Sequence, residues 1–594
     1  MKQFLITVAG VFVGLMLFAV GLPILLISAA ISAAKPAPPP SQSVLSLDLR
    51  QGVTDQEVSS PFGGFGGRAL SVMGIERILL RAEKDDRVKG LFVRLPEGGM
   101  APAAADELRL AFKHFRAAGK PITVHSQGLY PSGIVTSTYE LAASSGDVWM
   151  QPSSSFQVTG VASQDLFFKR FFDKYGVVAD YQQRYEYKNA VNPFLYSDYT
   201  TAHRESELSW LGSIYGTGLA SAAQDRGKTL GDLKTLIEAG PYSAETAKDK
   251  GLVDHIGQEK EAEDAILKQA GDGARMLDFA SYAATSRQAA ALGGAGLPAV
   301  GVISAEGDIV TGTGKHANPF GSGGNIYSDD VAKAFYAAIA DKDVKAIVFR
   351  VSSPGGSDTA SEQILAAVRA AKAAGKPVVV SMGTYAASGG YWISSQASEI
   401  VAQPSTLTGS IGVFGGKFAL GPALARFGVD MRGLGVGGDY AGAFGSGAAM
   451  SDKQRAAFSA WMDAIYNGFV SRVAEGRKLS PERVREIAKG RVWTGVQAKD
   501  LGLVDQLGGF ALAVDRAKAL AHIQGDARLK AINAQVSPFE ALSRMFGAGA
   551  DATRIMASAA LLAKDPSAQA IAGEVRDGEL RAQGATVLAP RLVR

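Results

Sequence analysis

The chain has 594 residues, of which 47% are hydrophobic and 20% are charged, and its formal net charge is +4. This length exceeds what one hydrophobic core supports, so we expect at least two domains, and the apolar content excludes a mainly disordered chain. So small a net charge gives no reason to expect nucleic acid as a partner. The chain has no cysteine, and its six histidines lack the spacing of a helical zinc motif, which argues against a metalloenzyme.

The N-terminus carries an uncharged run, residues 4–34, between Lys2 and Lys35. A helix of about 20 apolar residues crosses a bilayer, so this run predicts a transmembrane anchor in which Pro23 is tolerated as a kink. A cleaved signal peptide is the alternative, because small residues precede Lys35, but the length of the run favours a retained anchor. The proline-rich residues that follow predict a stiff spacer, so that 1–40 form one segment and the body is exported.

The body contains an internal repeat. Four short stretches recur in the same order about 250 residues further on. The matching pairs are VKGLFVR 88–94 with VKAIVFR 344–350, RAAGKP 116–121 with KAAGKP 372–377, QPS 151–153 with QPS 403–405, and AKDKGLVD 247–254 with AKDLGLVD 498–505. This period is far too long for a solenoid, and it predicts two copies of one domain, residues 41–290 and 291–536.

In both copies, short apolar runs alternate with helical patterns in the same order. In the second copy, residues 346–351 and 377–382 are typical of buried strands, and the alanine-rich residues 361–374 between them predict a crossover helix. This alternation predicts an α/β fold with a parallel sheet flanked by helices in each copy. Beyond the copies, residues 537–594 form a C-terminal segment, in which 539–564 predict one or two helices before a loose tail.

A candidate nucleophile follows the strand at 377–382. Small residues around Ser388 permit a sharp turn from strand to helix that exposes its hydroxyl. Backbone N–H groups at the start of that helix, and those of Gly355 and Gly356 after the preceding strand, can stabilise an oxyanion. Each stretch alone is more often an ordinary glycine-rich turn. Together, at the ends of successive strands, they predict acyl transfer.

A serine nucleophile needs a base, and no histidine is near these motifs in the sequence. Lys188, in YEYKNAVNPF, is a candidate for the base, because burial can keep a lysine neutral. The alternative is a surface lysine that lies over aromatic rings. At the offset of the repeat, Lys188 falls opposite Tyr440 and Ser388 falls opposite Thr136. Each copy has therefore kept one half of a pair, which predicts a dyad assembled across the two copies.

These motifs together resemble the signal peptide peptidase A (protease IV) family of bacteria, in its long, duplicated form with an N-terminal anchor. The resemblance covers about residues 40–535. The stretches that carry it are SPGG 353–356, AASGGYW 386–392, LTGSIG 407–412, YKNAVNPF 187–194, RVWTG 491–495 and GLVD 502–505. Several motifs in the right order make the resemblance specific.

The resemblance implies a ClpP/crotonase-like fold for each copy and a Ser-Lys dyad, with Ser388 as nucleophile and Lys188 as general base. It further implies that Ser410 orients the lysine, and that the N–H of Gly389 and that of Gly355 or Gly356 form the oxyanion hole. No metal, nucleotide or other cofactor is implied.

The same resemblance implies the substrate and the location. The substrates are hydrophobic signal peptides after their release by signal peptidase. The protein is a single-pass protein of the bacterial inner membrane with its catalytic body on the periplasmic side, and it assembles as a homo-oligomer, a tetramer in the long form.

Two other classes of function stay open. A crotonase-type acyl-CoA enzyme would use the glycine turns on a thioester without a serine nucleophile, but the anchor and the Ser/Lys split count against it. A non-catalytic membrane scaffold would keep only the fold, and the intact Ser388, Lys188 and Gly355-Gly356 count against that.

Overall fold

The computed structural model describes residues 40–56, 70–293, 296–314, 324–532 and 587–588. The predicted anchor at 4–34 and the predicted helices within 539–564 are outside these ranges. No helix within the described ranges combines the length and the apolar character needed to cross a membrane. The anchor therefore stays a prediction.

The first repeat is built on a sheet of six parallel strands in the order β8-β4-β3-β2-β1-β9. The strands are β1 (Ser43–Asp48), β2 (Val88–Arg94), β3 (Ile122–Ser126), β4 (Val148–Met150), β8 (His255–Ile256) and β9 (Arg275–Asp278). Alternate side chains of the strands face opposite sides of the sheet, and both sides are buried. Leu45 and Leu91 pack against α3 (Val72–Ala82), α4 (Pro102–Ala117) and α5 (Val135–Ser145), whereas Val44 and Phe92 pack against α11 (Glu259–Ala270).

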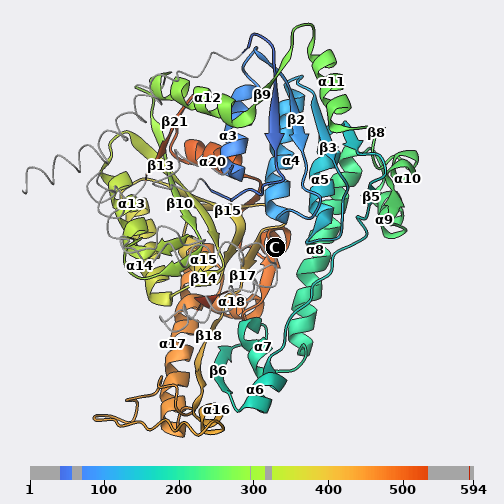
Figure 1. Cartoon of the computed structure of the whole chain (residues 1–594). Helices are drawn as coiled ribbons and strands as arrows, with labels where there is room; N and C mark the ends of the chain where they lie inside the picture. Colours follow the sequence, from blue (N-terminus) through green and yellow to red (C-terminus); the bar gives the residue numbers. More distant parts are fainter. Residues whose placement is uncertain (1–39, 57–69, 294–295, 315–323, 533–586, 589–594) are drawn as a thin grey trace, which may run out of the picture.

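The second repeat reproduces this sheet strand for strand, as β20-β16-β15-β13-β10-β21. Figure 1 shows the two repeats, with β2 and β3 labelled in the first and β10, β13 and β15 in the second. Its strands are β10 (Ala299–Glu306), β13 (Val344–Ser353), β15 (Val378–Ala387), β16 (Glu399–Ala402), β20 (Gln506–Leu507) and β21 (Arg528–Ala531). The helices α13 (Ser328–Ala340), α14 (Asp358–Ala373) and α15 (Gly389–Ser394) cover one face, and α20 (Phe510–Leu520) covers the other. The predicted α/β fold with parallel sheets is confirmed, and the equal strand orders show the duplication directly.

Two short strands extend the second sheet beyond the repeated order. β17 (Leu407–Gly409) pairs in parallel with the end of β15, and β19 (Val492–Thr494) pairs antiparallel with β17. The strand predicted at 377–382 therefore continues to Ala387 as β15, because its last residues have a partner of their own in β17. This extension carries the chain to Ser388.

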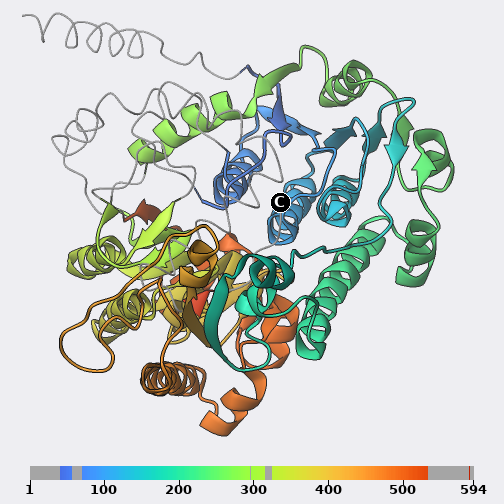
Figure 2. The same cartoon turned by 60° about the horizontal axis from the view of Figure 1, so that its bottom comes forward.

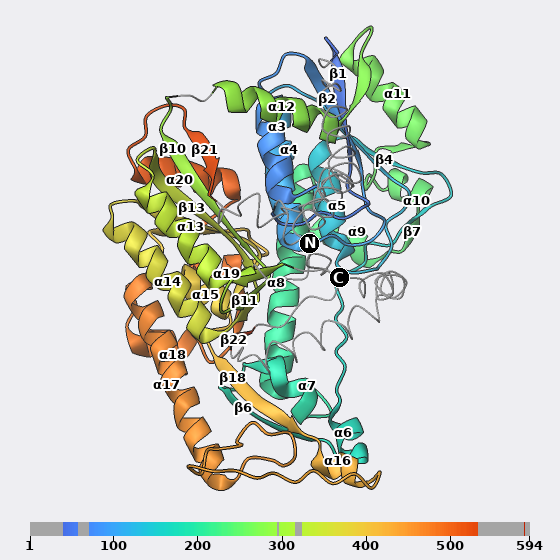
Figure 3. The ribbon, with the colours of Figure 1, turned by 60° about the vertical axis from the view of Figure 1, so that its left-hand side comes forward.

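An arm of the first repeat reaches into the second. β6 (Val178–Arg184) is not a strand of the first sheet; it pairs antiparallel along its whole length with β18 (Val413–Ala419). After it, Val191 and Phe194 are buried against Phe414 and Val310 of the second repeat. Figure 3 shows β6 and β18 side by side below the two sheets, and in Figure 2 the teal arm lies among the yellow and orange elements.

The remaining elements surround this arm or close the repeats. In the first repeat they are β5 (Ser155–Phe156), α6 (Lys169–Tyr175), η2 (Asn189–Val191), α7 (Asn192–Leu195), α8 (Thr201–Asp225), α9 (Leu230–Glu238), β7 (Tyr242–Ser243), α10 (Ala244–Asp249) and α12 (Phe279–Gly293). In the second they are α16 (Gly421–Ala425), α17 (Asp452–Arg477), α18 (Pro481–Ile487) and α19 (Gly495–Asp500).

A third, small sheet lies at the carboxyl end of β13. Its order is β12-β11-β14-β22, and its strands are β11 (Asp308–Val310), β12 (Asn325–Tyr327), β14 (Gly355–Gly356) and β22 (Val587–Leu588). β14 consists of the two glycines that the sequence marked as oxyanion donors. The small sheet therefore belongs to the candidate site.

Candidate active site

Ser388 is at the turn between β15 and α15. Its backbone has φ +56° and ψ −117°, a conformation that costs energy for a residue with a side chain. The glycines that follow are required by close packing, since a Cβ on Gly390 would lie 2.5 Å from the Ser353 carbonyl oxygen and one on Gly389 would lie 2.9 Å from Ser361 Oγ. The sharp strand-to-helix turn expected from the sequence is present.

The glycine pair lies directly beside this turn. A Cβ on Gly389 would come within 3.1 Å of both Gly355 Cα and the Gly356 nitrogen. The Gly355 N–H donates to Ser353 Oγ at 3.2 Å, and the Ser357 N–H donates to the Ile309 carbonyl at 2.8 Å. The N–H of Gly355 thus already has an acceptor, whereas the Gly356 nitrogen lies right beside the turn that holds Ser388. Of the two glycines, Gly356 has the N–H better placed to bind an oxyanion.

Lys188 meets Ser388 across the boundary of the repeats. Its Nζ lies 2.8 Å from Ser388 Oγ, 2.9 Å from Ser410 Oγ and 3.1 Å from the Ser410 carbonyl oxygen. Lys188 is 1% exposed and the two serines are fully buried. Burial lowers the pKa of Lys188 well below its usual value, because the charged ammonium loses its hydration. A neutral amine can donate its two hydrogens to Ser410 and turn its lone pair towards the Ser388 hydroxyl.

The segment that follows β6 fixes the backbone of Lys188. The Tyr187 N–H donates to the Lys489 carbonyl at 3.2 Å, which ties the segment to the second repeat. Gly490 packs directly on the lysine, since a Cβ there would lie 2.5 Å from Lys188 Cβ. After the lysine, Asn192 Nδ2 donates to Asn189 Oδ1 at 3.3 Å, so the two asparagines close a buried turn. Gly490 was not among the residues predicted from the sequence, where its only signal is its place before the RVWTG motif.

Ser410 is held between two neighbouring segments. Its N–H donates to the Arg491 carbonyl at 2.7 Å, and the carbonyl of the preceding Gly409 accepts from the Ser388 N–H at 2.8 Å. The residue that approaches the lysine is thus fixed relative to the serine by a single peptide group. The structure brings together all six residues that the sequence marked, Ser388, Lys188, Ser410, Gly389, Gly355 and Gly356.

The corresponding place in the first repeat is filled by its own hydrogen bonds. Thr136, aligned with Ser388, is buried at the start of α5, and a glycine pair, Gly98-Gly99, follows β2 as Gly355-Gly356 follows β13. Thr138 Oγ1 donates to the Gly98 carbonyl at 2.8 Å and accepts from the Met100 N–H at 3.1 Å. This glycine pair was not among the residues predicted from the sequence, although its separation from the second pair is close to the period of the repeat.

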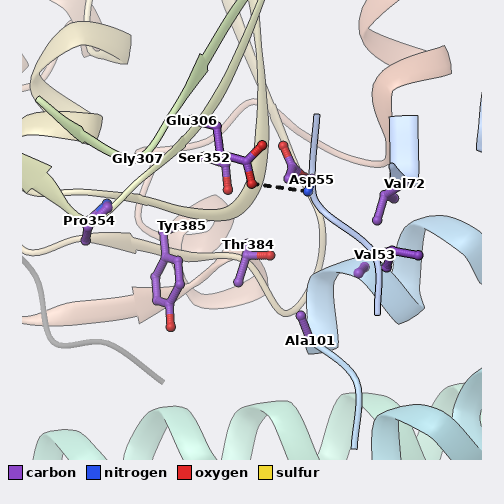
Figure 4. A pocket seen from close by; sticks show the side chains of 11 residues that line it. Val53, Asp55, Val72, Ala101, Glu306, Gly307, Ser352, Pro354, Thr384 and Tyr385 are labelled. Carbon is purple, nitrogen blue, oxygen red and sulfur yellow. Dashed lines mark hydrogen bonds between the residues drawn. The ribbon is translucent and has the colours of Figure 1, made fainter. Parts of the chain in front are cut away.

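A cavity of about 150 Å³ lies between the repeats, next to the strands that lead to the glycine pair and to Ser388 (Figure 4). Pro354 and Tyr385 line it from the second repeat, and Val53 and Ala101 from the first. Its polar wall includes Glu306, whose carboxylate accepts the Asp55 N–H. Burial, and then the charge of Asp55, raise the pKa of Glu306 to about 7.

Comparison with known proteins finds the same family in both repeats. The model of peptidase family S49 matches residues 114–271 and 370–524, which is more than half of the chain. "Protease 4" of Salmonella typhi is 34% identical over 509 residues, which cover 82% of this chain and 79% of that protein. "Protease 4" of Haemophilus influenzae is 31% identical, with 77% and 74% covered, and "Serine protease SPPA, chloroplastic" of Arabidopsis thaliana is 27% identical, with 81% and 69% covered.

One family match lies in each repeat, and the first includes β6 and the lysine segment, so the similarity concerns both repeats and not one motif. The S49 model covers Lys188 in its first match and Ser388 with Ser410 in its second. Together with the long alignments to two proteins called Protease 4, this shows that the chain belongs to peptidase family S49.

Proposed function

We propose that the chain is a serine endopeptidase that degrades released, hydrophobic signal peptides with a Ser-Lys dyad shared between its two ClpP/crotonase-like repeats. Membership of family S49 makes it a serine peptidase. The observation that carries the assignment of the dyad is the 2.8 Å contact between Lys188 Nζ and Ser388 Oγ in a place closed to water. A lysine without hydration and without a carboxylate partner among its hydrogen bonds is suited to act as a base.

In the proposed reaction, neutral Lys188 takes the hydroxyl proton as Ser388 Oγ attacks the scissile carbonyl. The N–H of Gly389, which as the first residue of α15 has no partner within the helix, and the N–H of Gly356 receive the oxyanion. Lys188 then passes the proton to the leaving amine. Water hydrolyses the ester and regenerates the serine.

The substrate class follows from the resemblance to signal peptide peptidase A, and the cavity beside the site supports it. Its walls include small or branched apolar side chains, Val53, Val72, Ala101 and Ala104. Side chains of this kind suit the alanine- and leucine-rich cores of signal peptides. The carboxyl of Glu306, with its pKa of about 7, is partly protonated near neutral pH, so burying it under an apolar ligand costs less than burying a full charge.

We propose the same organisation for the full chain that the sequence predicted. Residues 1–40 anchor the protein in the bacterial inner membrane, 41–290 and 291–536 are the two repeats on the periplasmic side, and 537–594 follow them. A homotetramer is proposed for the assembly. Apolar side chains exposed at the far end of the second repeat support self-association, namely Phe427, Leu434, Val436 and Trp461.

The test is hydrolysis of a leucine-rich fluorogenic peptide by the detergent-solubilised protein. Ser388→Ala and Lys188→Ala should each abolish hydrolysis while the oligomer and its melting temperature persist. Thr136→Ala is the matched control, since Thr136 holds the position of Ser388 in the first repeat, and it should keep wild-type activity. Full activity in Lys188→Ala would refute the dyad. Hydrolysis by Ser388→Ala would refute the serine peptidase and favour the acyl-CoA enzyme or the scaffold.

A serine-reactive acylating probe gives an independent readout. The peptidase should be labelled at Ser388, with labelling lost in Lys188→Ala because the hydroxyl is no longer activated. An acyl-CoA enzyme or a scaffold with the same fold would leave Ser388 unlabelled.

A further inference from the structure

The cavity between the repeats has the size of one side chain. Its volume is about 150 Å³, whereas pockets that bind whole small molecules measure about 300–1,000 Å³. Pro354 in its wall directly precedes Gly355, and Tyr385 is three residues before Ser388. A strand advances about 3.3 Å per residue, so the wall at Tyr385 lies within about 10 Å of the nucleophile. The cavity is therefore within reach of a substrate side chain two or three residues from the scissile bond.

The lining of this cavity combines apolar side chains with a carboxyl group. Val53, Val72 and Ala101 line it from the first repeat. Glu306, the last residue of β10, extends its carboxylate towards Asp55, as Figure 4 shows. Apolar walls suit a chain of methylene groups, and a carboxylate at their end suits a positive charge. The lining therefore matches the side chain of lysine or arginine better than a purely apolar one.

Glu306 has backbone partners but no cation of its own. Its carboxylate accepts the Asp55 N–H at 3.2 Å and the Gln56 N–H at 2.9 Å, and no lysine or arginine within the described ranges forms an ion pair with it. Arg350, whose charge acts on Glu306, is already shared by the carboxylates of Asp55 and Glu107. Burial and the charge of Asp55 hold the pKa of Glu306 at about 7. A cation that enters the cavity would favour the ionised carboxylate.

From these observations we propose that the cavity binds one lysine or arginine side chain of the peptide substrate, and that Glu306 is the residue that selects it. The methylene groups of the bound side chain lie along Val53, Val72 and Ala101, and its ammonium or guanidinium group donates to the Glu306 carboxylate. The proposal rests on the peptidase function proposed above and names a specificity-determining residue for the same site.

A signal peptide offers such a side chain. It begins with a positively charged region and continues with an apolar core of about 7–15 residues. A basic residue held in the cavity, two or three residues from Ser388, places the start of the apolar core across the nucleophile. Glu306 thus sets the register of the cut, because the cleaved bond lies at a fixed distance from the bound cation.

The first experiment tests this register. Two leucine-rich peptides of equal length carry a single lysine, at positions one residue apart, and the products that the detergent-solubilised wild-type protein releases are identified by mass. The cleaved bond should move by one residue with the lysine. A cut whose position ignores the lysine would overturn the proposal, while hydrolysis of both peptides would leave the peptidase function standing.

The second experiment tests the charge. The peptide carries lysine, Nε-acetyl-lysine or norleucine at the same position, and kcat/KM is compared within each protein variant. In wild type, lysine should exceed the two uncharged residues at least about tenfold, the worth of one charged hydrogen bond. This preference should disappear in Glu306→Gln and return in part in Glu306→Asp. Glu399→Gln is the matched control and should keep the preference, because Glu399 pairs with Arg516 at the opposite end of the same sheet.

Ala101→Lys tests the same cavity while Glu306 and its backbone contacts remain. Ala101 lines the cavity and is partly exposed, so the new ammonium should pair with Glu306 and reduce the preference for lysine severalfold. This variant decides the question if loss of the contacts to the Asp55 and Gln56 N–H groups unfolds Glu306→Gln. An unchanged preference in Ala101→Lys, or in a folded Glu306→Gln, would mean that another group binds the cation and would overturn the proposal.

The outcomes separate this proposal from the peptidase function. If wild type hydrolyses the lysine and norleucine peptides equally well and cuts both at the same bond, the cation subsite is wrong and the peptidase function stands. If wild type hydrolyses none of the peptides and the acylating probe does not label Ser388, the peptidase function itself has failed.

Discussion

At the scale of single residues, the site depends on one buried lysine. Lys188 has three polar contacts, and all of them are to serine oxygens rather than to carboxylates. Nothing in this set compensates a positive charge fully, so desolvation dominates and the pKa falls. The same burial that would make an ammonium costly provides a neutral amine at a pH where exposed lysines are protonated.

This lysine predicts the pH dependence of the reaction. The base works only when unprotonated, so kcat/KM for the fluorogenic peptide should rise with pH through the lowered pKa of Lys188 and then reach a plateau. The free energy of unfolding should also rise with pH. Between the lowered pKa of Lys188 in the folded protein and its usual value near 10.5, the unfolded chain binds one proton more than the folded chain. A pH–rate profile of wild type checks this, and a rate that falls with increasing pH across neutrality contradicts it.

Ser410 gives a second prediction at this scale. Its hydroxyl accepts from Lys188 Nζ, so Ser410→Ala removes one of the two acceptors that orient the amine. We expect kcat to fall about tenfold, the worth of roughly one hydrogen bond, with little change in KM. A hydroxyl acceptor also favours the ammonium over the amine, so its loss should move the rising limb of the pH profile to lower pH.

The pH profile distinguishes positioning from mere loss of packing. Ser395→Ala is the control, because it removes another fully buried hydroxyl of the same repeat, one that donates to the Trp392 carbonyl. This control should change neither kcat nor the position of the limb. A Ser410→Ala profile that coincides with wild type after scaling would show that Ser410 does not act on the lysine.

At the scale of elements, the sequence predicted the parts that follow a local pattern. The strands at 346–351 and 377–382 and the helix at 361–374 were found within a few residues as β13, β15 and α14, because burial on both faces leaves continuous apolar runs. The pairing of β6 with β18 left no such pattern, since the two strands are more than 200 residues apart and belong to different repeats. Comparison of the copies indicated that a lysine and a serine were shared, but not which strand carries the lysine across.

Gly490 shows why the strand and segment that carry Lys188 to Ser388 could not be predicted from local sequence patterns. Its φ is +83°, and a Cβ built on it would lie within 2.6 Å of the Lys188 nitrogen and Cα. The lysine segment therefore needs a glycine at this point of the other repeat. The contact joins two segments about 300 residues apart, and no periodicity records it. Ser388 and its glycines were predictable, by contrast, because the whole turn lies within five residues.

This contact yields a prediction with a close control. In Gly490→Ala the new methyl group would meet Lys188 Cβ and Cα, so the lysine must shift and kcat should fall at least about tenfold, as expected when a reacting group is displaced. Gly502→Ala introduces the same strain at φ +78° but meets no atom closer than 3.8 Å. Both variants should lose about 1 kcal/mol of stability from the positive φ, and only the first should lose activity. Equal activities of the two, measured on the fluorogenic peptide, would contradict the role of this contact.

At the scale of the whole molecule, a dyad split between repeats requires a rigid interface. Its centre is Arg350 on β13, which is completely buried and donates to Asp55 and Glu107 of the first repeat and to Ser381 of the second. Glu306 extends the contact, because it accepts the N–H groups of Asp55 and Gln56. The duplication supplied a matching arginine, Arg94 on β2, but that residue pairs with Glu259 of its own repeat, whose side chain is partly exposed.

The two arginines therefore predict opposite sensitivities at equivalent positions. Arg350→Met leaves the buried carboxylates of Asp55 and Glu107 without a cation, and breaking a buried pair in this way costs about 3–5 kcal/mol. Arg94→Met breaks a pair whose side chains are 12% and 38% exposed, and because water reaches the glutamate, which stays solvated, we expect a cost of about 1 kcal/mol. Thermal melting of both variants should show a large loss for the first only. Peptidase activity should fall with Arg350→Met even below its melting temperature, because Lys188 and Ser388 reach each other only while the repeats stay in register. Near-equal melting temperatures for the two variants would mean that the arm formed by β6 and α7, rather than the buried charges, holds the two halves of the site together.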